Sequence, residues 1–351
     1  MNSIKLKISS LLIFFSCWGG QLNAQSLIDT LKYNINKADS DTLRLKLLVE
    51  FTDYCEITDI PKYTKQAITL ADKLLAENKY DSKMLLYNRA MANNNNGFYY
   101  HFIGDHRSSI KYYNLSLKEF TDVPDSSYMA LVYNNLAMVY NDLGDVDTTI
   151  HLLKIAEFIC LKHNYIESLI PTYSNLATYY NKYGDFQKSI EYSNQLLKIH
   201  QGLNNVDGIV HTYNNLSSIY YVQNNYLKAE KYILKALSFK DQLFKTEALA
   251  IYYYNLSSIQ SKLNKDSLAF INATESLNIN KEIYHLKGIG DSYKLLGGYY
   301  LDKKEYNLAI AYSDSAHQIY TEINFLEGLS TVNKSKSFIY YELKDYQTAK
   351  K

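Results

Sequence analysis

One octet recurs in this chain at a fixed interval of 40 residues, and it constrains the fold more than any other feature of the sequence. The first clear copy is Tyr133-Asn-Asn-Leu-Ala-Met-Val-Tyr140, and later copies begin at Tyr173, Tyr213, Tyr253 and Tyr293. One interval upstream, residues 93–100 keep the asparagine, the small residue and the closing tyrosine, and downstream the pattern fades over residues 333–340. A repeat that persists without insertion for more than 200 residues indicates one supersecondary unit, stacked many times.

The apolar spacing predicts two helices in each unit. If the first residue of the octet is position 4, then positions 4, 7 and 11 are apolar or aromatic and position 8 is small, which makes one face of a helix, here called helix A. Four residues after each octet the chain carries a turn signal, in register: Gly104, Gly144, Gly184, Asn224, Asn264, Lys304 and Lys344. Glycine or asparagine suits the left-handed residue that ends a helix, and a following aspartate can cap the next one, helix B.

Small residues also repeat on helix B. They occupy Ser109, Thr149, Ser189, Ala229, Ala269, Ala309 and Ala349, and again Ser116, Ala156, Ala236, Ser276 and Ala316. Together with the small residue at position 8, they let the two helix backbones approach each other closely. Each unit is therefore predicted to be a helical hairpin with one apolar side left for its neighbour.

These residues resemble the tetratricopeptide repeat. The matching features are the small residue at position 8 with a leucine before it and a tyrosine after it, the turn Gly184-Asp-Phe186, and Ala229 with Ala236 on helix B. The 40-residue spacing is longer than the common 34-residue form and is similar to the variety in kinesin light chains and LGN/Pins adaptors. The resemblance implies an all-α fold, a right-handed α–α superhelix (solenoid) of tandem hairpins.

The predicted organisation follows from these patterns. Residues 1–24 form a signal peptide, residues 25–40 a capping helix, and residues 41–351 the array, with about seven and a half units: 41–78, 82–121, 126–162, 166–203, 206–243, 246–283, 286–323 and 326–351. In the first unit we expect helix A over 43–55, helix B over 63–75 and Pro61 in the turn between them. The last unit stops within its helix B, so we expect the protein to continue past Lys351.

The first 24 residues are typical of an exported protein. Lys5 and Lys7 precede the apolar run 8–20, and Leu22-Asn-Ala24 provides a small residue before Gln25, so cleavage is expected after Ala24. The alternative is lipidation at Cys17, whose preceding residues fit a lipobox poorly. Loss of the two lysines changes the formal net charge from +1 to −1. The predicted location is periplasmic, or the extracytoplasmic face of the inner membrane.

Charge and cysteine content exclude several classes of function. The balance of 37 basic and 36 acidic residues gives no basic surface for nucleic acid or an anionic membrane, so membrane contact is expected only through a segment beyond Lys351. Cys55 and Cys160 are expected to be free thiols, since stacked hairpins hold them too far apart for a disulfide.

We find no phosphate-binding loop, zinc-protease motif or nucleophile elbow, and predict no cofactor. His101 and His106 could be drawn as a metal pair, but their spacing across a turn fixes no geometry. Ordinary surface or groove histidines are the preferred interpretation.

Asparagines at position 6 make up the main candidate site, here called the asparagine ladder: Asn95, Asn135, Asn175, Asn215 and Asn255. Asparagine is a mediocre residue inside a helix, so five copies need a reason. One is that an amide matches the N–H and C=O groups of an extended peptide lying on the concave side, which helix A lines. The other is that each amide bonds a neighbouring repeat. Further candidate groove residues are Asn94, Asn134, Asn214, Tyr221, Tyr254 and Lys294.

Three classes of function remain open. The leading one is a non-catalytic scaffold that binds a protein or peptide and serves as the sensory part of a longer signalling protein. This order of segments resembles bacterial regulators in which such an array precedes a histidine kinase or a LuxR-type DNA-binding domain. The alternatives are a free-standing periplasmic or secreted adaptor and, more remotely, an enzyme with its site in the groove.

Overall fold

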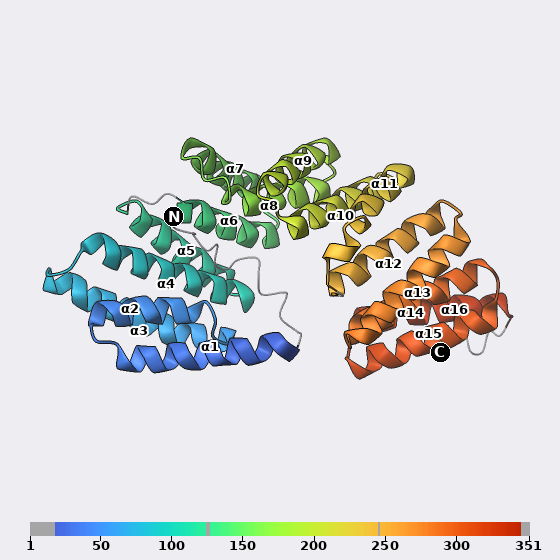
Figure 1. The fold of residues 1–351 in the computed structure, drawn as a ribbon, viewed down its shortest axis with the longest axis horizontal. Helices are drawn as coiled ribbons and strands as arrows, with labels where there is room; N and C mark the ends of the chain where they lie inside the picture. The colour runs from blue at the N-terminus through green and yellow to red at the C-terminus, as the bar shows by residue number, and fades with distance from the viewer. Residues whose placement is uncertain (1–17, 124–126, 245, 345–351) are drawn as a thin grey trace. The chain divides into compact units, whose positions relative to one another are not determined.

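Every regular element in the described part of the chain is helical. The computed structural model describes residues 18–123, 127–244 and 246–344, without the side chains of 18–25. These ranges contain sixteen α-helices, two short 3-10 helices and no strand (Figure 1). The predicted all-α fold of tandem hairpins is confirmed. The chain divides into two compact units at Tyr179–Tyr180, inside one helix, and each unit is described by itself.

The helices alternate as the repeat pattern predicts, with even-numbered helices as helix A from α2 to α16 and odd-numbered ones as helix B from α3 to α15 (Figure 1). The bounds are α1 Trp18–Lys37, α2 Asp41–Thr52, η1 Ile57–Asp59, α3 Ile60–Glu77, α4 Ser82–Phe102, α5 His106–Phe120, α6 Ser127–Asp142, α7 Val146–Lys162, α8 Leu169–Lys182, α9 Phe186–Gly202, α10 Val206–Val222, α11 Tyr226–Leu237, η2 Lys240–Gln242, α12 Glu247–Lys262, α13 Asp266–Glu282, α14 Leu286–Asp302, α15 Tyr306–Glu322 and α16 Leu326–Glu342.

The turns between helix A and helix B have the predicted backbone. All seven turn residues take a positive φ, from 56° at Asn264 to 81° at Gly184. The next residue caps helix B where it is an aspartate or asparagine: Asp105, Asp145, Asp185 and Asn225 each accept the backbone N–H three residues on. Lysine at position 304 must therefore adopt a conformation that glycine reaches without steric cost.

Where the two helices of a hairpin approach closely, a serine hydroxyl of one helix donates to a backbone carbonyl of the other. Ser109 on helix B donates to the carbonyl of Gly97 on helix A (2.8 Å). In later repeats the hydroxyl has changed sides, so that Ser217 donates to the carbonyl of Ala229 and Ser257 to that of Ala269, both at 2.7 Å. These hydroxyls are buried, so they need partners, and the carbonyls within reach across the closely packed helices satisfy them, as the small residues lead us to expect.

Parallel tyrosine rings form a second link inside the hairpins. The position-11 tyrosine stacks on a tyrosine twelve residues later, with ring centroids 5.2–5.8 Å apart and planes within 11° of each other: Tyr100–Tyr112, Tyr180–Tyr192, Tyr220–Tyr232 and Tyr300–Tyr312. Such aromatic pairs contribute about 0.5–1.5 kcal/mol beyond the stabilisation that their buried area provides. Part of the chain's high tyrosine content thus has a structural role.

The first hairpin packs against α1. Leu31 and Ile35 of α1 are buried in one cluster with Leu45 and Leu48 of α2 and Leu74 of α3. Helix α2 ends at Thr52, three residues before the end of the predicted helix A. The predicted turn residue Pro61 lies instead in the first turn of α3, where a missing N–H is tolerated. Cys55 is half-buried after α2, Cys160 is buried on α7, and both are free thiols.

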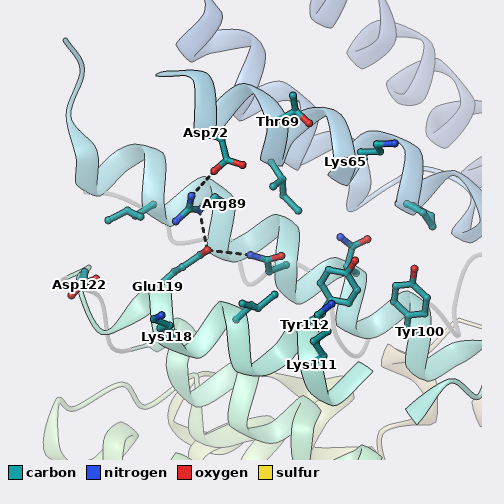
Figure 2. A pocket seen from close by; sticks show the side chains of 16 residues that line it. Lys65, Thr69, Asp72, Arg89, Tyr100, Lys111, Tyr112, Lys118, Glu119 and Asp122 are labelled. Atoms are coloured by element: carbon teal, nitrogen blue, oxygen red, sulfur yellow. Dashed lines mark hydrogen bonds and ion pairs between the residues drawn. The ribbon is translucent and has the colours of Figure 1, made fainter. Parts of the chain in front are cut away.

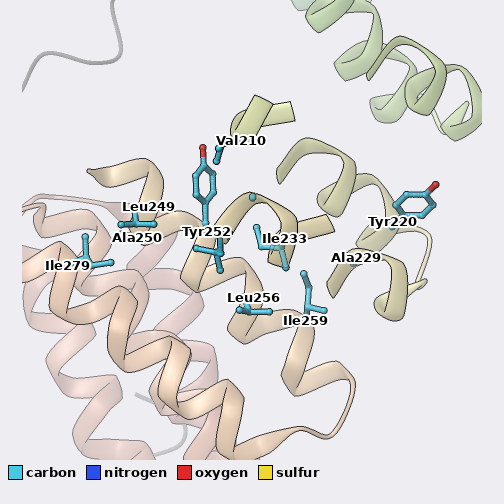
Figure 3. Packing of buried hydrophobic residues seen from close by; sticks show 12 residues of the cluster. Val210, Tyr220, Ala229, Ile233, Leu249, Ala250, Tyr252, Leu256, Ile259 and Ile279 are labelled. Carbon is cyan, nitrogen blue, oxygen red and sulfur yellow. The ribbon is translucent and has the colours of Figure 1, made fainter. Parts of the chain in front are cut away.

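In the second unit, the core joins successive repeats. Ile233 of α11 is buried with Val210 of α10 and with Leu249, Leu256 and Ile259 of α12 (Figure 3). The remainder of the last predicted unit, from residue 345, lies outside the described residues, as does most of the predicted signal peptide. Among the described helices, none combines the length and apolarity that a membrane span requires.

Candidate functional site

In the first of the two compact units, which ends at Tyr179, ladder asparagines bond to the preceding repeat. The Nδ2 group of Asn135 donates to Oδ1 of Asn94 (3.1 Å), and that of Asn175 donates to Oδ1 of Asn134 (3.3 Å). Asn95 reaches back to the first hairpin, where its Nδ2 donates to the Thr52 hydroxyl (2.7 Å). A position-6 amide therefore bonds a position-5 amide of the preceding repeat, as the second alternative for the ladder expected.

Fixed acceptors determine which way these amides face. Asn95 also donates to the carboxylate of Asp53 (3.2 Å), which cannot donate in return, so its Oδ1 faces Asn94 and accepts from that amide (3.1 Å). Asn134 donates to the backbone carbonyl of Ala130 (2.9 Å), so its Oδ1 faces Asn175. Both chains of hydrogen bonds leave the position-6 carbonyl oxygens of Asn135 and Asn175 directed away from the pair.

The second unit repeats the arrangement once and departs from it once. Asn255 donates to Oδ1 of Asn214 in the preceding repeat (2.8 Å). Asn215 instead lies 3.3 Å from Nδ1 of His211, one turn earlier on its own helix. The same position thus links two repeats at Asn255 and stays within one helix at Asn215.

Two of the remaining predicted groove residues in the second unit, Lys294 and Tyr254, lie near the carboxylate of Asp291. Lys294 forms an ion pair with Asp291 (3.2 Å), which also accepts from the buried hydroxyl of Tyr320 (2.7 Å). Burial, followed by the charge of Asp291, raises the pKa of Tyr254 to about 12, so its phenol stays protonated at neutral pH. Tyr221 packs edge-on against Tyr226, with ring centroids 5.4 Å apart.

Sequence reasoning missed the pairing of positions 5 and 6, although a signal was present. Asn94, Asn134 and Asn214 are each followed 41 residues later by an asparagine, and these are the three amide pairs. Comparison of residues one repeat apart cannot show that offset. Peptide binding by the ladder stays a prediction.

His101 and His106, which were considered as a metal pair, have other contacts. Nε2 of His101 lies 2.8 Å from Oδ2 of Asp142 in the next repeat, and the rings of His101 and His106 are 5.9 Å apart. Within the described residues, no group of three or more histidine, cysteine or acidic side chains is arranged to hold a metal ion.

A second feature of the first unit is an open cavity of about 720 Å³ between α3 and α5, floored by α4 (Figure 2). At one end Arg89 of α4 pairs with Asp72 of α3 and with Glu119 of α5 (2.9 Å from Nε). The amide of Asn93 also donates to Glu119. Burial raises the pKa of Glu119, while Arg89 opposes that rise. Sequence analysis did not identify this cavity.

Comparison with known proteins supports the repeat assignment. Residues 168–242 match the model of the tetratricopeptide-repeat family. Similar solved structures are aspartyl phosphate phosphatase F from Bacillus subtilis (16% identity, 94% of this chain and 87% of that one, TM-score 0.64) and the apo quorum sensor NprR from B. thuringiensis (16%, 94% and 91%, 0.62).

A third similar structure is the Rap conjugation regulator of plasmid pLS20, in complex with the Phr* peptide (13%, 93% and 92%, 0.53). A search of curated proteins gives no significant match. At these identities the likeness concerns the fold. Residues 168–242 thus contain tetratricopeptide repeats, and the in-register octets continue on the same fold of tandem helical hairpins over the rest of the described array.

Proposed function

We propose that the array binds an extended polypeptide segment at the asparagine ladder. The observation that carries this proposal is the unused capacity of the ladder. Among the described residues, no hydrogen bond uses the Oδ1 atom of Asn135, Asn175 or Asn255. Each of these amides donates from its Nδ2 group to the neighbouring repeat, and its Oδ1 atom can still accept from a partner's backbone N–H. The ladder then has both roles that the sequence leaves open.

Amides that a neighbouring repeat already holds in place are suited to binding a peptide backbone. A carbonyl oxygen whose own N–H group is already bonded has little rotamer freedom to lose when a partner arrives. Tyr254, next to Asn255 in the sequence, adds a phenol, and tyrosine gives contact area at low entropic cost. Amides of this kind bind and orient rather than catalyse, so we propose a scaffold without enzymatic activity.

Asn215 allows the proposal to be tested without disturbing the stack, because its amide does not bond another repeat. Peptides are selected from a random displayed library on the wild-type array. If the ladder binds their backbone, Asn215→Ala should weaken the recovered peptides by about 5- to 150-fold, the equivalent of about 1–3 kcal/mol. Leu227→Ala, at an exposed site on α11, is the control. Equal affinity of both variants and wild type would exclude Asn215 from the binding site, and the same result with Asn255→Ala, which removes one of the unused acceptors, would exclude the ladder.

We propose further that this array is the receptor part of an exported signalling protein, facing the periplasm. The support is the basic start and short apolar run of residues 1–24, together with the description of one similar fold as a quorum sensor. Mass spectrometry of the protein from its native cell should find Gln25 at the amino terminus. An intact Met1 or a lipidated Cys17 would contradict export by this route. A free-standing exported adaptor is the alternative.

A further inference from the structure

The cavity between α3 and α5 lies on the side of α4 opposite to the ladder. Its α4 lining residues are Leu86 and, further along the helix, four polar residues, Arg89, Asn93, Asn96 and Tyr100, at spacings of four, three and four. At 100° per residue these four share one face, whereas Asn94 and Asn95 fall on the other. The cavity is therefore separate from the proposed peptide site.

Its two ends differ in charge. At one end the carboxylates of Asp72 and Glu119 are already paired with Arg89 (Figure 2). The other end gathers Lys65 from α3, Tyr100 from α4, and Lys111 and Tyr112 from α5 (Figure 2). Among the described residues, no ion pair joins Lys65 or Lys111 to a carboxylate. This end presents two unpaired ammonium groups.

The same end also presents aromatic surface. The rings of Tyr100 and Tyr112 stack with centroids 5.2 Å apart, and Nζ of Lys111 lies 5.8 Å from the centroid of Tyr112. Burial raises the pKa of Tyr100, so its phenol stays a neutral donor at pH 7. Apolar side chains of Ile68, Leu86 and Leu115 line the space between the two ends. The two ammonium groups can donate to an anion, as can one of the two phenols, whose hydroxyls are hydrogen-bonded to each other, and none of the four groups is an obligate acceptor.

We propose that this cavity binds a small organic anion with an aromatic or apolar body. The anionic group lies between Lys65 and Lys111, and the body lies along the tyrosine stack and the apolar residues beyond it. A cavity of about 720 Å³ falls within the range of small-molecule sites. Because Asp72 and Glu119 hold Arg89 in place, the opposite end favours a neutral body over a second anion.

Three naphthalene derivatives test the proposal, because they share one body and differ in charge. Calorimetric titration of the full chain compares 2-naphthoate, the neutral 2-naphthamide and the cationic 2-naphthylmethylammonium. We expect saturable binding of one 2-naphthoate per chain, at least about tenfold tighter than 2-naphthamide, with the cation weakest. The preference for the anion should shrink as salt rises.

Variants locate the anion. Lys65→Gln with Lys111→Gln should reduce the preference for 2-naphthoate over 2-naphthamide to less than about twofold. Lys118→Gln, a lysine at the Arg89 end of the same cavity, is the matched control and should keep the preference. All three lysines are exposed, so the fold should tolerate these changes. Absence of saturable binding, equal binding of the anion and the amide, or a preference that survives loss of both lysines would overturn the proposal. Asn215→Ala should leave 2-naphthoate binding unchanged, which separates this site from the ladder.

Discussion

The ladder provides a matched pair of substitutions at one repeat position. Asn255 bonds Asn214 of the preceding repeat at 2.8 Å, whereas within the described residues the side-chain hydrogen bond of Asn215 is to His211 on its own helix. Both ladder residues are half-buried on a helix A, and both precede Leu-Ser-Ser-Ile. Truncation of each to alanine therefore compares a link between repeats with a link within one helix.

The magnitudes follow from three contributions. Loss of an inter-repeat hydrogen bond costs about 0.5–1.5 kcal/mol, and loss of a pair one turn apart on a helix costs about 0.2–0.5 kcal/mol. Alanine returns about 0.6 kcal/mol of helix propensity at either site. Asn255→Ala should then destabilise the second unit by about 0 to 0.9 kcal/mol, and Asn215→Ala should be neutral or slightly stabilising. A double-mutant cycle between Asn214 and Asn255 should give a coupling of about 1 kcal/mol.

Urea unfolding at 25 °C, followed by circular dichroism, measures these differences. Because a repeat array need not unfold in one step, hydrogen exchange in α10 and α12 should accompany it. Faster exchange is expected in Asn255→Ala and not in Asn215→Ala. If the two variants have the same stability, or if the cycle gives no coupling, the inter-repeat amide pair does not stabilise the stack and our account of the ladder is wrong.

Three further predictions concern the repeat framework, each measured by urea unfolding. Lys304→Gly should stabilise by up to about 1 kcal/mol, because glycine relieves the positive φ of 59°, whereas Gly184→Ala, at the equivalent turn, should destabilise by a similar amount; no gain in the former contradicts the argument. Burial lowers the pKa of His200, so the unfolded chain takes up this proton first and stability is lost as pH falls below about 6.5, by up to about 1.4 kcal/mol per pH unit. His200→Asn should reduce that loss, and an unchanged pH dependence would refute it. Gln260 and Asn272 occupy the two positions at which Tyr220 and Tyr232 stack in the preceding repeat. The substitutions Gln260→Tyr and Asn272→Tyr should therefore couple favourably, by about 0.5–1.5 kcal/mol in a double-mutant cycle, and zero coupling would exclude a restored stack.

Turns and hairpins could be predicted because their signals are local and repeated. A residue such as Gly184 ends one helix through its own backbone, and Asp185 caps the next through an atom three residues away. Neither depends on where other repeats lie. The prediction failed slightly at α2 and Pro61, where the first repeat departs from the later copies.

The partners of the ladder and the cavity could not be predicted in the same way. The asparagines at position 6 were evident from the sequence, but their bonds depend on which face of one helix meets the next. The cavity depends on the separation of α3 and α5 above α4, which composition does not determine. Arg89 does not recur at the same position of later repeats, so the repeat pattern could not indicate it. Its ion pairs with Asp72 and Glu119 depend on how α3, α4 and α5 pack.

One buried network shows how departures from a repeat are to be interpreted. Glu230 is 8% exposed, at a position where other repeats place Ile110, Ile150, Ile190, Phe270 and Ile310. A carboxylate buried alone would be costly. Its partners have changed with it: Lys265 donates to it at 2.6 Å and Gln260, in place of the stacked tyrosine, at 3.3 Å. Asn272, in place of the second tyrosine, completes the network by donating to Gln260 (2.7 Å). Taken singly, each of these four residues is an unexplained departure from the residue type at the same position of most other repeats. Because they contact one another where α11, α12 and α13 meet, they form one network, and the buried charge is tolerated because Lys265 pairs with it and Gln260, held by Asn272, donates to it.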